Sequence, residues 1–322
     1  MGHLSSRTRG GRNVALAAAA AWSQRHPGLP KPTASHLLKT HPNSTVCKLD
    51  GARPDGSAVV AKLAPQAAIA SERWFYSHIL PDLPVETPEC LGVTTSEHGF
   101  WLFLSYVDGL PYDSSRTEHR RLAGRYAGLL HATSSRHGLD KGLARRGTAF
   151  VKEQLDGALA AVHCGRTNEA VAKGDQAMLR EFQSRLDLLE ARWSQFGEFL
   201  DSMPHAIVHG DFVSKNLRVL ETGGEEELVV MDWEMAGWGP VAMDLGWVDV
   251  EAYRSTIAST WPGLDAGTLT DLSNCGRLLR VVTAVQWEAA GLRASHVERS
   301  TQRLRAYLEQ LDSVLAAAHW IE

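Results

Sequence analysis

Apolar and polar residues alternate with a period of two through much of the first third of the chain. Alternation over a short segment is typical of a half-buried β-strand, because successive side chains point to opposite faces. Turn-forming residues separate these segments, and one example is the Pro-Asp-Gly tripeptide that ends at Gly56. The expected strands cover residues 35–40, 45–49, 58–63, 89–93 and 100–106.

From residue 115 onward the period changes to about 3.6, which indicates amphipathic helices. The clearest apolar stripe repeats at alternating steps of three and four and is interpreted as core: Leu179, Phe182, Leu186, Leu189, Trp193 and Phe196. Other helices are expected at residues 66–80, 115–132, 150–162 and 304–318. A strand-rich first third and a helix-rich remainder predict an α+β protein with two lobes. We expect an N-terminal lobe at residues 1–104, a hinge at 105–112 and a C-terminal lobe at 113–322.

The first residues of the chain combine arginines with an apolar run. Arg7, Arg9 and Arg12 precede residues 14–22, as in the basic and apolar regions of a signal peptide. The run is mostly alanine, which is a strong helix former, and Ser-Gln-Arg-His follows where a cleavage site should be. We interpret this segment as a surface helix ended by Pro27-Gly28, with a targeting role as the alternative.

Composition excludes several classes of protein. The chain has 322 residues, which is ample for one large or two modest domains. Its 33 basic and 37 acidic side chains give a formal charge of −4, so no nucleic-acid partner is expected. No run of about 18 apolar residues is present, so no membrane-spanning helix is expected. The four cysteines lie far apart without metal or disulfide spacing, which favours a reducing cytoplasm.

The chemistry of the chain is concentrated in residues 205–234. An apolar strand leads into a polar loop that carries His209, Asp211 and Asn216, and a later strand ends at Asp232. Two acids and one amide oxygen at strand ends suit a hard cation such as Mg²⁺ with a phosphate ester on it. The spacing His-x-Asp-x₄-Asn is typical of the kinase catalytic loop, where Asp takes the proton of the acceptor hydroxyl and Asn holds a metal.

Three motifs in this order resemble the aminoglycoside phosphotransferase and choline kinase family. They are His209-Gly-Asp211-x₄-Asn216, Asp232-Trp-Glu and Gly239-Pro-x₃-Asp244-Leu245. The resemblance implies a protein-kinase-like two-lobe fold, with a small antiparallel sheet in the N-terminal lobe and a larger, mostly helical C-terminal lobe. It also implies that Asp211 is the catalytic residue, that Asn216 and Asp232 hold Mg²⁺, and that Asp244 is structural.

Lysine 62 lies in the tetrad Val-Val-Ala-Lys of the third expected strand, and Glu72 follows ten residues later on the next helix. By resemblance to kinases, Lys62 would bind the α- and β-phosphates of the nucleotide, and Glu72 would orient its ammonium group. The first turn lacks Gly-x-Gly-x-x-Gly, so the hydroxyls of Ser44 and Thr45 are expected to help bind the phosphates.

Residues 102–109 resemble the inter-lobe hinge of the family. The resemblance implies that the Ser105 carbonyl and the Val107 amide bind the adenine edge. Backbone recognition leaves no side-chain signature, so ATP is expected and GTP is also possible.

The expected reaction moves the γ-phosphoryl group of ATP to a hydroxyl of a small molecule, an aminoglycoside-like or other antibiotic. Several acids and tryptophans could attract and enclose a cationic acceptor. They are Asp108, Asp113, Asp249, Glu251 and Glu288, with Trp247, Trp261 and Trp287.

Four alternatives stay open at this point. A metabolic kinase would act on an amino sugar, choline or homoserine, and a kinase-like module would bind a nucleotide without catalysis. A metal-dependent hydrolase would use His209, Asp211 and Asp232 as ligands, but no further histidine motif completes such a site. A protein kinase is disfavoured, because the eleven residues between Asp232 and Asp244 leave no room for a long activation segment.

Overall fold

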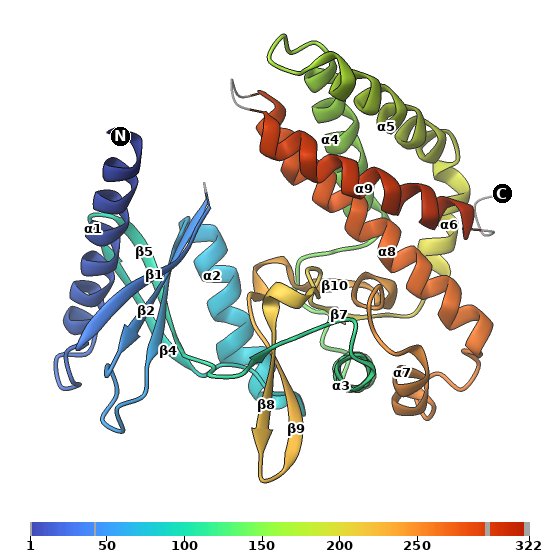
Figure 1. Cartoon of the computed structure of the whole chain (residues 1–322). Coiled ribbons are helices and arrows are strands. Elements are labelled where there is room, and N and C mark those ends of the chain that lie inside the picture. Colours follow the sequence, from blue (N-terminus) through green and yellow to red (C-terminus); the bar gives the residue numbers. More distant parts are fainter. Residues whose placement is uncertain (1, 42, 294–296, 319–322) are drawn as a thin grey trace. The chain divides into compact units, whose positions relative to one another are not determined.

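The computed structural model of the protein describes residues 2–41, 43–293 and 297–318 (Figure 1). The chain forms two compact units. The first comprises Met1–Tyr112 and Ser214–Glu234, and the second comprises Asp113–Val213 and Met235–Glu322. The domain boundaries expected from the sequence stay a prediction.

A five-stranded sheet forms most of the first unit, and each neighbouring pair of strands is antiparallel. In spatial order the strands are β1 (Ala34–His41), β2 (Ser44–Asp50), β3 (Val59–Ala64), β5 (Gly99–Ser105) and β4 (Cys90–Ser96). Lys62 on the central strand β3 lies opposite Val46 of β2 and Leu102 of β5. The small antiparallel sheet expected for the N-terminal part is confirmed. Between the expected strands at residues 35–40 and 45–49, Pro42 lies outside the described residues.

The N-terminal helix α1 (Gly2–Arg25) packs on this sheet. Its Ala15, Ala18, Ala21 and Trp22 belong to one buried cluster with side chains of β2, β3 and β5. The ring of Trp22 meets Phe103 edge-on, with centroids 5.2 Å apart. The helix expected here therefore contributes one side of the core of the first unit. Within the part of the chain that the structure describes, no helix combines the length and the apolar character that crossing a membrane requires.

The helix expected at residues 66–80 is divided into three parts. α2 covers Gln66–Trp74, a π-helical turn covers Phe75–Ile79, and a 3₁₀ turn covers Leu80–Asp82. Pro81 has no N–H to donate to the preceding turn, so it helps to end the regular helix although Leu80 before it keeps an α conformation.

A three-stranded sheet completes the first unit. It contains β6 (Leu110–Pro111), β8 (Leu217–Thr222) and β9 (Glu225–Val230). Gly223 and Gly224 connect β8 and β9 with φ angles of 65° and 88°, as a two-residue hairpin turn with both residues at positive φ requires.

The second unit is mostly helical. Its helices are α3 (Thr117–Arg136), α4 (Thr148–Arg166), α5 (Lys173–Ala191), α6 (Trp193–Ser202), α7 (Val250–Ile257), α8 (Ala266–Ala289) and α9 (Glu298–Ala316). A pair of antiparallel strands, β7 (His205–Val208) and β10 (Gly237–Pro240), lies among them. Short 3₁₀ turns are η3 (Ser214–Asn216, in the first unit), η4 (Trp233–Met235), η5 (Val241–Asp244) and η6 (Ala290–Arg293). The mostly helical C-terminal part, and with it the expected fold class, is confirmed.

Two features of the second unit differ from the expectation. The apolar stripe of residues 179–196 is interrupted at Arg192, whose backbone leaves the helical conformation and separates α5 from α6. Both Trp193 and Phe196 of the stripe lie on α6, where Phe196 is buried and Trp193 is only half-buried. The long helix α8 was not expected from the pattern, although 13 of its residues are buried.

Candidate functional site

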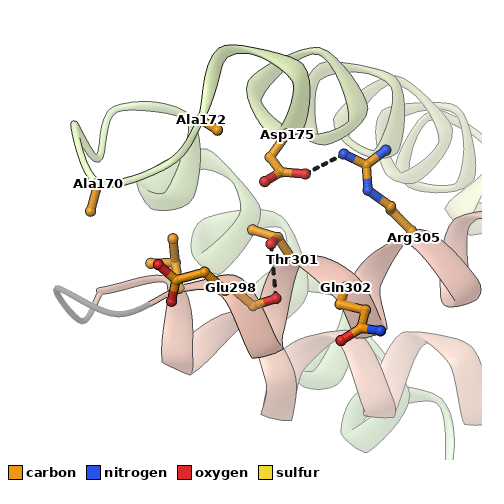
Figure 2. Close-up of a pocket in the computed structure, with 8 residues that line it drawn as sticks. Ala170, Ala172, Asp175, Glu298, Thr301, Gln302 and Arg305 are labelled. Atoms are coloured by element: carbon orange, nitrogen blue, oxygen red, sulfur yellow. Dashed lines mark hydrogen bonds and ion pairs between the residues drawn. The ribbon is translucent and has the colours of Figure 1, made fainter.

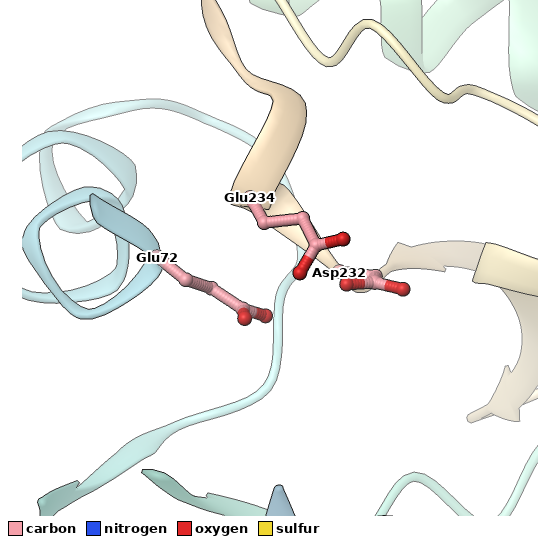
Figure 3. Close-up of side chains that lie close together, drawn as sticks. All are labelled: Glu72, Asp232 and Glu234. Carbon is pink, nitrogen blue, oxygen red and sulfur yellow. The ribbon is translucent and has the colours of Figure 1, made fainter. Parts of the chain in front are cut away.

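Lys62 forms the centre of a cluster of charged side chains in the first unit. It is 5% exposed. Its Nζ lies 2.7 Å from Glu72 Oε2, 2.5 Å from Asp232 Oδ1 and 2.9 Å from Glu234 Oε2. Figure 3 shows the three acids converging, Glu72 from α2 and the other two from the segment after β9. The structure therefore brings together Lys62, Glu72 and Asp232, and it adds Glu234.

The β8–β9 hairpin brings Asn216 close to the residues that precede Asp232. In its register Leu217 lies opposite Val230. One step beyond this pair, the Met231 N–H donates a hydrogen bond to the Asn216 carbonyl oxygen at 2.9 Å. Because antiparallel pairing fixes which residues are neighbours, the register sets the positions of both proposed metal ligands.

The backbone of Asp232 is in an unusual conformation. Among the described residues it alone has a positive φ (71°) without being glycine. The Asp232 N–H donates to Tyr76 Oη at 3.3 Å, and Phe75 stacks on Trp233 with centroids 6.1 Å apart. Both aromatic residues come from the π-helical turn after α2. A left-handed non-glycine residue costs about 1–3 kcal/mol and is found preferentially at functional sites.

The Lys62 cluster has more negative than positive charge. Burial would lower the pKa of Lys62, but the charges of Glu72, Asp232 and Glu234 outweigh this effect and raise it. Burial also raises the pKa of Glu72 to about 7, although the charge of Lys62 opposes the shift. One oxygen from each of the three acids lies within 4.8 Å of the others, which suits a hard cation with oxygen ligands.

In the second unit, Asp244 accepts hydrogen bonds from the backbone of the His209-Gly-Asp loop. The N–H groups of His209 and Gly210 donate to its carboxylate at 2.7 and 2.9 Å. His131 Nε2 lies 3.2 Å from the same carboxylate, and His131 Nδ1 lies 3.0 Å from Tyr253 Oη. One buried acid thus holds two backbone N–H groups and His131, which agrees with a structural role for Asp244.

Glycine is required in this loop. Gly210 has a φ of 77°, and a Cβ atom there would lie 2.8 Å from the Met235 carbonyl oxygen. The next residue, Asp211, is 5% exposed, and its N–H donates to His209 Nδ1 at 3.2 Å. Arg280 of α8 lies nearby, with its Nε 3.7 Å from Asp211 Oδ1. Asp211 belongs to the second unit, whereas Asn216 and Asp232 belong to the first.

The other expected nucleotide-binding residues lie on the five-stranded sheet or just after it. Ser44 and Thr45 begin β2 and are half-buried. Ser105 ends β5, where its hydroxyl accepts a hydrogen bond from the Glu89 N–H at 2.9 Å. Val107 follows in a segment without regular structure. Their contacts with a nucleotide stay a prediction.

Four of the acids expected around an acceptor already have local partners. Asp113 accepts from the Ser115 N–H at 2.8 Å, and Asp249 caps α7 by accepting from the Ala252 N–H at 2.8 Å. Glu251 pairs with Arg254 at 2.7 Å, and Glu288 pairs with Arg303. Trp247 and Trp287 are exposed, and Trp261 is half-buried.

A separate surface cavity of about 360 Å³ lies in the second unit, beside the start of α9 (Figure 2). Its polar wall includes Asp175 and Arg305, which form an ion pair. None of the residues that line this cavity was expected to take part in binding or catalysis.

An antiparallel sheet that carries a buried Lys–Glu pair, together with a mostly helical second unit, defines the class of kinase-like small-molecule phosphotransferases. Residues 43–261 match the phosphotransferase enzyme family, and the chain belongs to that family. The resemblance inferred from the sequence is therefore confirmed, and the chain is an enzyme that transfers a phosphoryl group to a hydroxyl of a small molecule.

Solved structures share the fold across nearly the whole chain. The spectinomycin phosphotransferase APH(9)-Ia, in complex with ADP and spectinomycin, has a TM-score of 0.62 and 10% identity, over 91% of this chain and 97% of that chain. A microcompartment-associated aminopropanol kinase has a TM-score of 0.58 and 16% identity, over 93% and 97%. The GDP and kanamycin complex of APH(2")-IIia has a TM-score of 0.61 and 13% identity, over 92% and 98%. No curated protein matches the chain at a significant level.

Two residues near the expected site were missed from the sequence. Glu234 belongs to the Asp232-Trp-Glu motif, from which no role was assigned to it, yet it contacts Lys62. Arg280 lies on a helix that the pattern did not predict. The Asp-x-Glu spacing could have indicated Glu234, since both acids follow the same strand. No local signal identifies Arg280.

Proposed function

We propose that this enzyme transfers the γ-phosphoryl group of ATP, or alternatively GTP, to a hydroxyl group of a small molecule with Mg²⁺ as the cofactor. The observation that carries the proposal is the buried Lys62, whose Nζ lies 2.7 Å from Glu72 and 2.5 Å from Asp232. Such a lysine can bind the α- and β-phosphates, while an acid beside it holds the metal.

The residues of the first unit would bind and orient the nucleotide. Asn216 and Asp232 would hold Mg²⁺, which supplies charge neutralisation for the phosphate oxygens when it is bound. Ser44 and Thr45 would contribute hydroxyls to the phosphates. The backbone at Ser105 and Val107 would bind the base.

Asp211 in the second unit would orient the acceptor hydroxyl and accept its proton. The Asp244 network holds the backbone of the loop before Asp211, so the carboxylate is positioned before the acceptor arrives. Phosphoryl transfer passes through a loose transition state, so alignment of the two substrates supplies most of the rate enhancement.

The first acceptor class to test is the one expected from the sequence, an aminoglycoside-like or other antibiotic, with a role in antibiotic resistance. Amino sugars, choline and homoserine form the second class. Similar solved structures include a spectinomycin complex, a kanamycin complex and an aminopropanol kinase, so both acceptor classes have a precedent in this fold.

The test is a screen of these compounds for consumption of ATP and of GTP, with product mass checked for one added phosphoryl group. Lys62→Ala should weaken use of the nucleotide far more than binding of the acceptor. Stoichiometric nucleotide binding with no transfer to any alcohol would instead favour a non-catalytic kinase-like module. Tight retention of Zn²⁺ or Mn²⁺ without nucleotide would favour the hydrolase alternative.

A further inference from the structure

Arg280 is a cation that α8 places beside the proposed catalytic acid. The helix approaches the η5 turn closely, because Gly276 has no side chain: a Cβ there would lie 2.1 Å from the Ala242 carbonyl oxygen. Arg280 follows one turn later on the same face of α8. Its Nε reaches to 3.7 Å from Asp211 Oδ1.

Packing holds the guanidinium group of Arg280 more than hydrogen bonds do. Its Cζ lies 5.4 Å from the ring centroid of Trp287, which is 39% exposed. A separation of 3.7 Å from Asp211 is too long for a hydrogen bond. Its Nη1 is buried and has no hydrogen-bond acceptor among the described residues. A buried donor without an acceptor destabilises the protein, and a ligand oxygen that accepts from it can recover this free energy.

Arg277, three residues earlier on α8, differs from Arg280 in how its donors are used. It lies over Trp247 in the same way, with Cζ 5.4 Å from the ring centroid. Its Nε, however, donates a hydrogen bond to the Gly246 carbonyl oxygen at 2.8 Å, so this donor already has a backbone acceptor. Arg280 keeps donors for a ligand, and its side chain is 18% exposed.

Three of the acids that were expected to attract a cationic acceptor have partners elsewhere. Asp249 caps a helix, and Glu251 and Glu288 pair with arginines. Beside Asp211, the second unit instead places the positive side chain of Arg280. A guanidinium group matches the two oxygens of a carboxylate or phosphate, whereas it repels an ammonium group.

We propose that the acceptor carries an acidic group, a carboxylate or a phosphate, which Arg280 binds while Asp211 orients the hydroxyl that is phosphorylated. This inference rests on the proposed phosphoryl transfer, and it favours acidic acceptors over the cationic class that the sequence led us to expect. The hydroxyl oxygen bonds to the γ-phosphorus as the bond from that phosphorus to the leaving diphosphate breaks. The hydroxyl proton passes to Asp211, and the acidic group stays unchanged.

The test uses pairs of alcohols that differ in the acidic group: L-homoserine with 3-aminopropan-1-ol, D-glycerate with glycerol, and D-glucuronate with D-glucose. Kanamycin serves as a cationic probe. Binding to the full-length protein is measured by calorimetry with Mg²⁺ and the non-hydrolysable nucleotide AMP-PNP present. The proteins are the wild type, Arg280→Gln, Arg280→Lys and the control Arg254→Gln, which removes one positive charge from the exposed surface of α7.

In at least one pair, the acidic member should bind the wild type about 10-fold or more tightly than its mate, since charge-assisted hydrogen bonds have this order of strength. Arg280→Gln should lose about 10- to 100-fold in affinity for that acid, Arg280→Lys should lose less, and Arg254→Gln should match the wild type. Thermal unfolding checks that each variant folds.

The inference is overturned if no acidic member binds the wild type more tightly than its mate, or if Arg280→Gln keeps the full affinity. Tighter binding of kanamycin than of every acid also overturns it. The same panel is assayed for transfer of a phosphoryl group. If acids bind selectively but no phosphoryl group is transferred, the proposed function is contradicted. If transfer occurs only to neutral or cationic alcohols, the proposal that the acceptor carries an acidic group is contradicted.

Discussion

The two units of the enzyme each contain buried carboxylates, but they neutralise them in opposite ways. In the first unit, three acids share the single ammonium group of Lys62. In the second unit, the one acid Asp244 accepts from two backbone N–H groups and lies beside His131. The first arrangement keeps a surplus of negative charge that a cation can neutralise. The second is complete without a ligand.

The Lys62 cluster is thus suited to bind a cation, whereas the Asp244 network is suited to hold the loop before Asp211 in position. Ligand-free, the Lys62 cluster is costly, because the buried Glu72 loses hydration and the three carboxylates repel one another. The Asp244 network is stable, because fixed dipoles replace the lost water. We therefore expect variants in the first unit to change cofactor binding, and variants around Asp244 to change folding.

The largest effect is expected for Asp211→Asn, which keeps the shape of the side chain and removes its basic oxygen. A positioned base contributes about 10²- to 10⁴-fold to a rate, so kcat should fall by that factor. Nucleotide affinity, measured by titration calorimetry, should change little. Retained turnover would remove Asp211 from its proposed role.

Asp244→Ala should reduce the free energy of unfolding by about 3–5 kcal/mol, because it leaves buried donors without an acceptor. Denaturant unfolding followed by circular dichroism measures this change. Asp265→Ala is a control, since Asp265 is an exposed acid that accepts from the Thr268 N–H on the surface. If both variants lose the same stability, Asp244 is no more than an ordinary cap.

Asp232→Ala should weaken Mg²⁺-dependent nucleotide binding by about 100-fold, since removing even a group behind a metal ligand costs 10- to 100-fold. Adding EDTA should then change the nucleotide affinity of the variant little, while it weakens the wild type. Glu234→Gln provides the comparison, because it removes a second contact of Lys62 and leaves Asp232 in place. An unchanged Mg²⁺ titration in Asp232→Ala would exclude this residue as a ligand.

The smallest expected effect is a change in how the free energy of unfolding depends on pH. Burial raises the pKa of Glu72 from 4.5 to about 7 in the folded state. Its contribution to stability is therefore fully present below pH 4.5 and is lost as the pH rises through 7. In EDTA, the free energy of unfolding of Glu72→Gln should fall less over this window than that of the wild type. Parallel curves would show that Glu72 does not titrate there, and Glu89→Gln, at an exposed ion pair, is the control.

The sequence allowed a prediction of the elements that repeat a local pattern. The alternating strands, the Lys62–Glu72 spacing and the turn that ends at Gly56 each depend on near neighbours in the chain. The π-helical turn after α2 could not be predicted, because it follows from contacts of Phe75 and Tyr76 with residues near position 232. The interruption at Arg192 is invisible for the same reason, since the apolar stripe continues across it.

In the candidate site, too, residues within a local motif could be predicted, whereas a residue brought in by tertiary packing could not. Motifs indicated Asp211, Asn216 and Asp232, because their spacing within one segment follows a known pattern. Arg280 lies 69 positions after Asp211 and reaches it only through the close packing at Gly276. Long-range charge pairs of this kind are set by tertiary packing. The acids expected around a cationic acceptor were candidates by composition alone, and local partners engage four of them.

The β8–β9 hairpin has a consequence for how related chains can vary in length. Asn216 and Met231 remain neighbours only while both strands grow or shrink together. A pair of added residues, one in each strand, lengthens the hairpin and keeps this end aligned, whereas a single added residue demands a bulge or another kind of turn. Insertions and deletions between these two positions should therefore occur preferentially in even numbers.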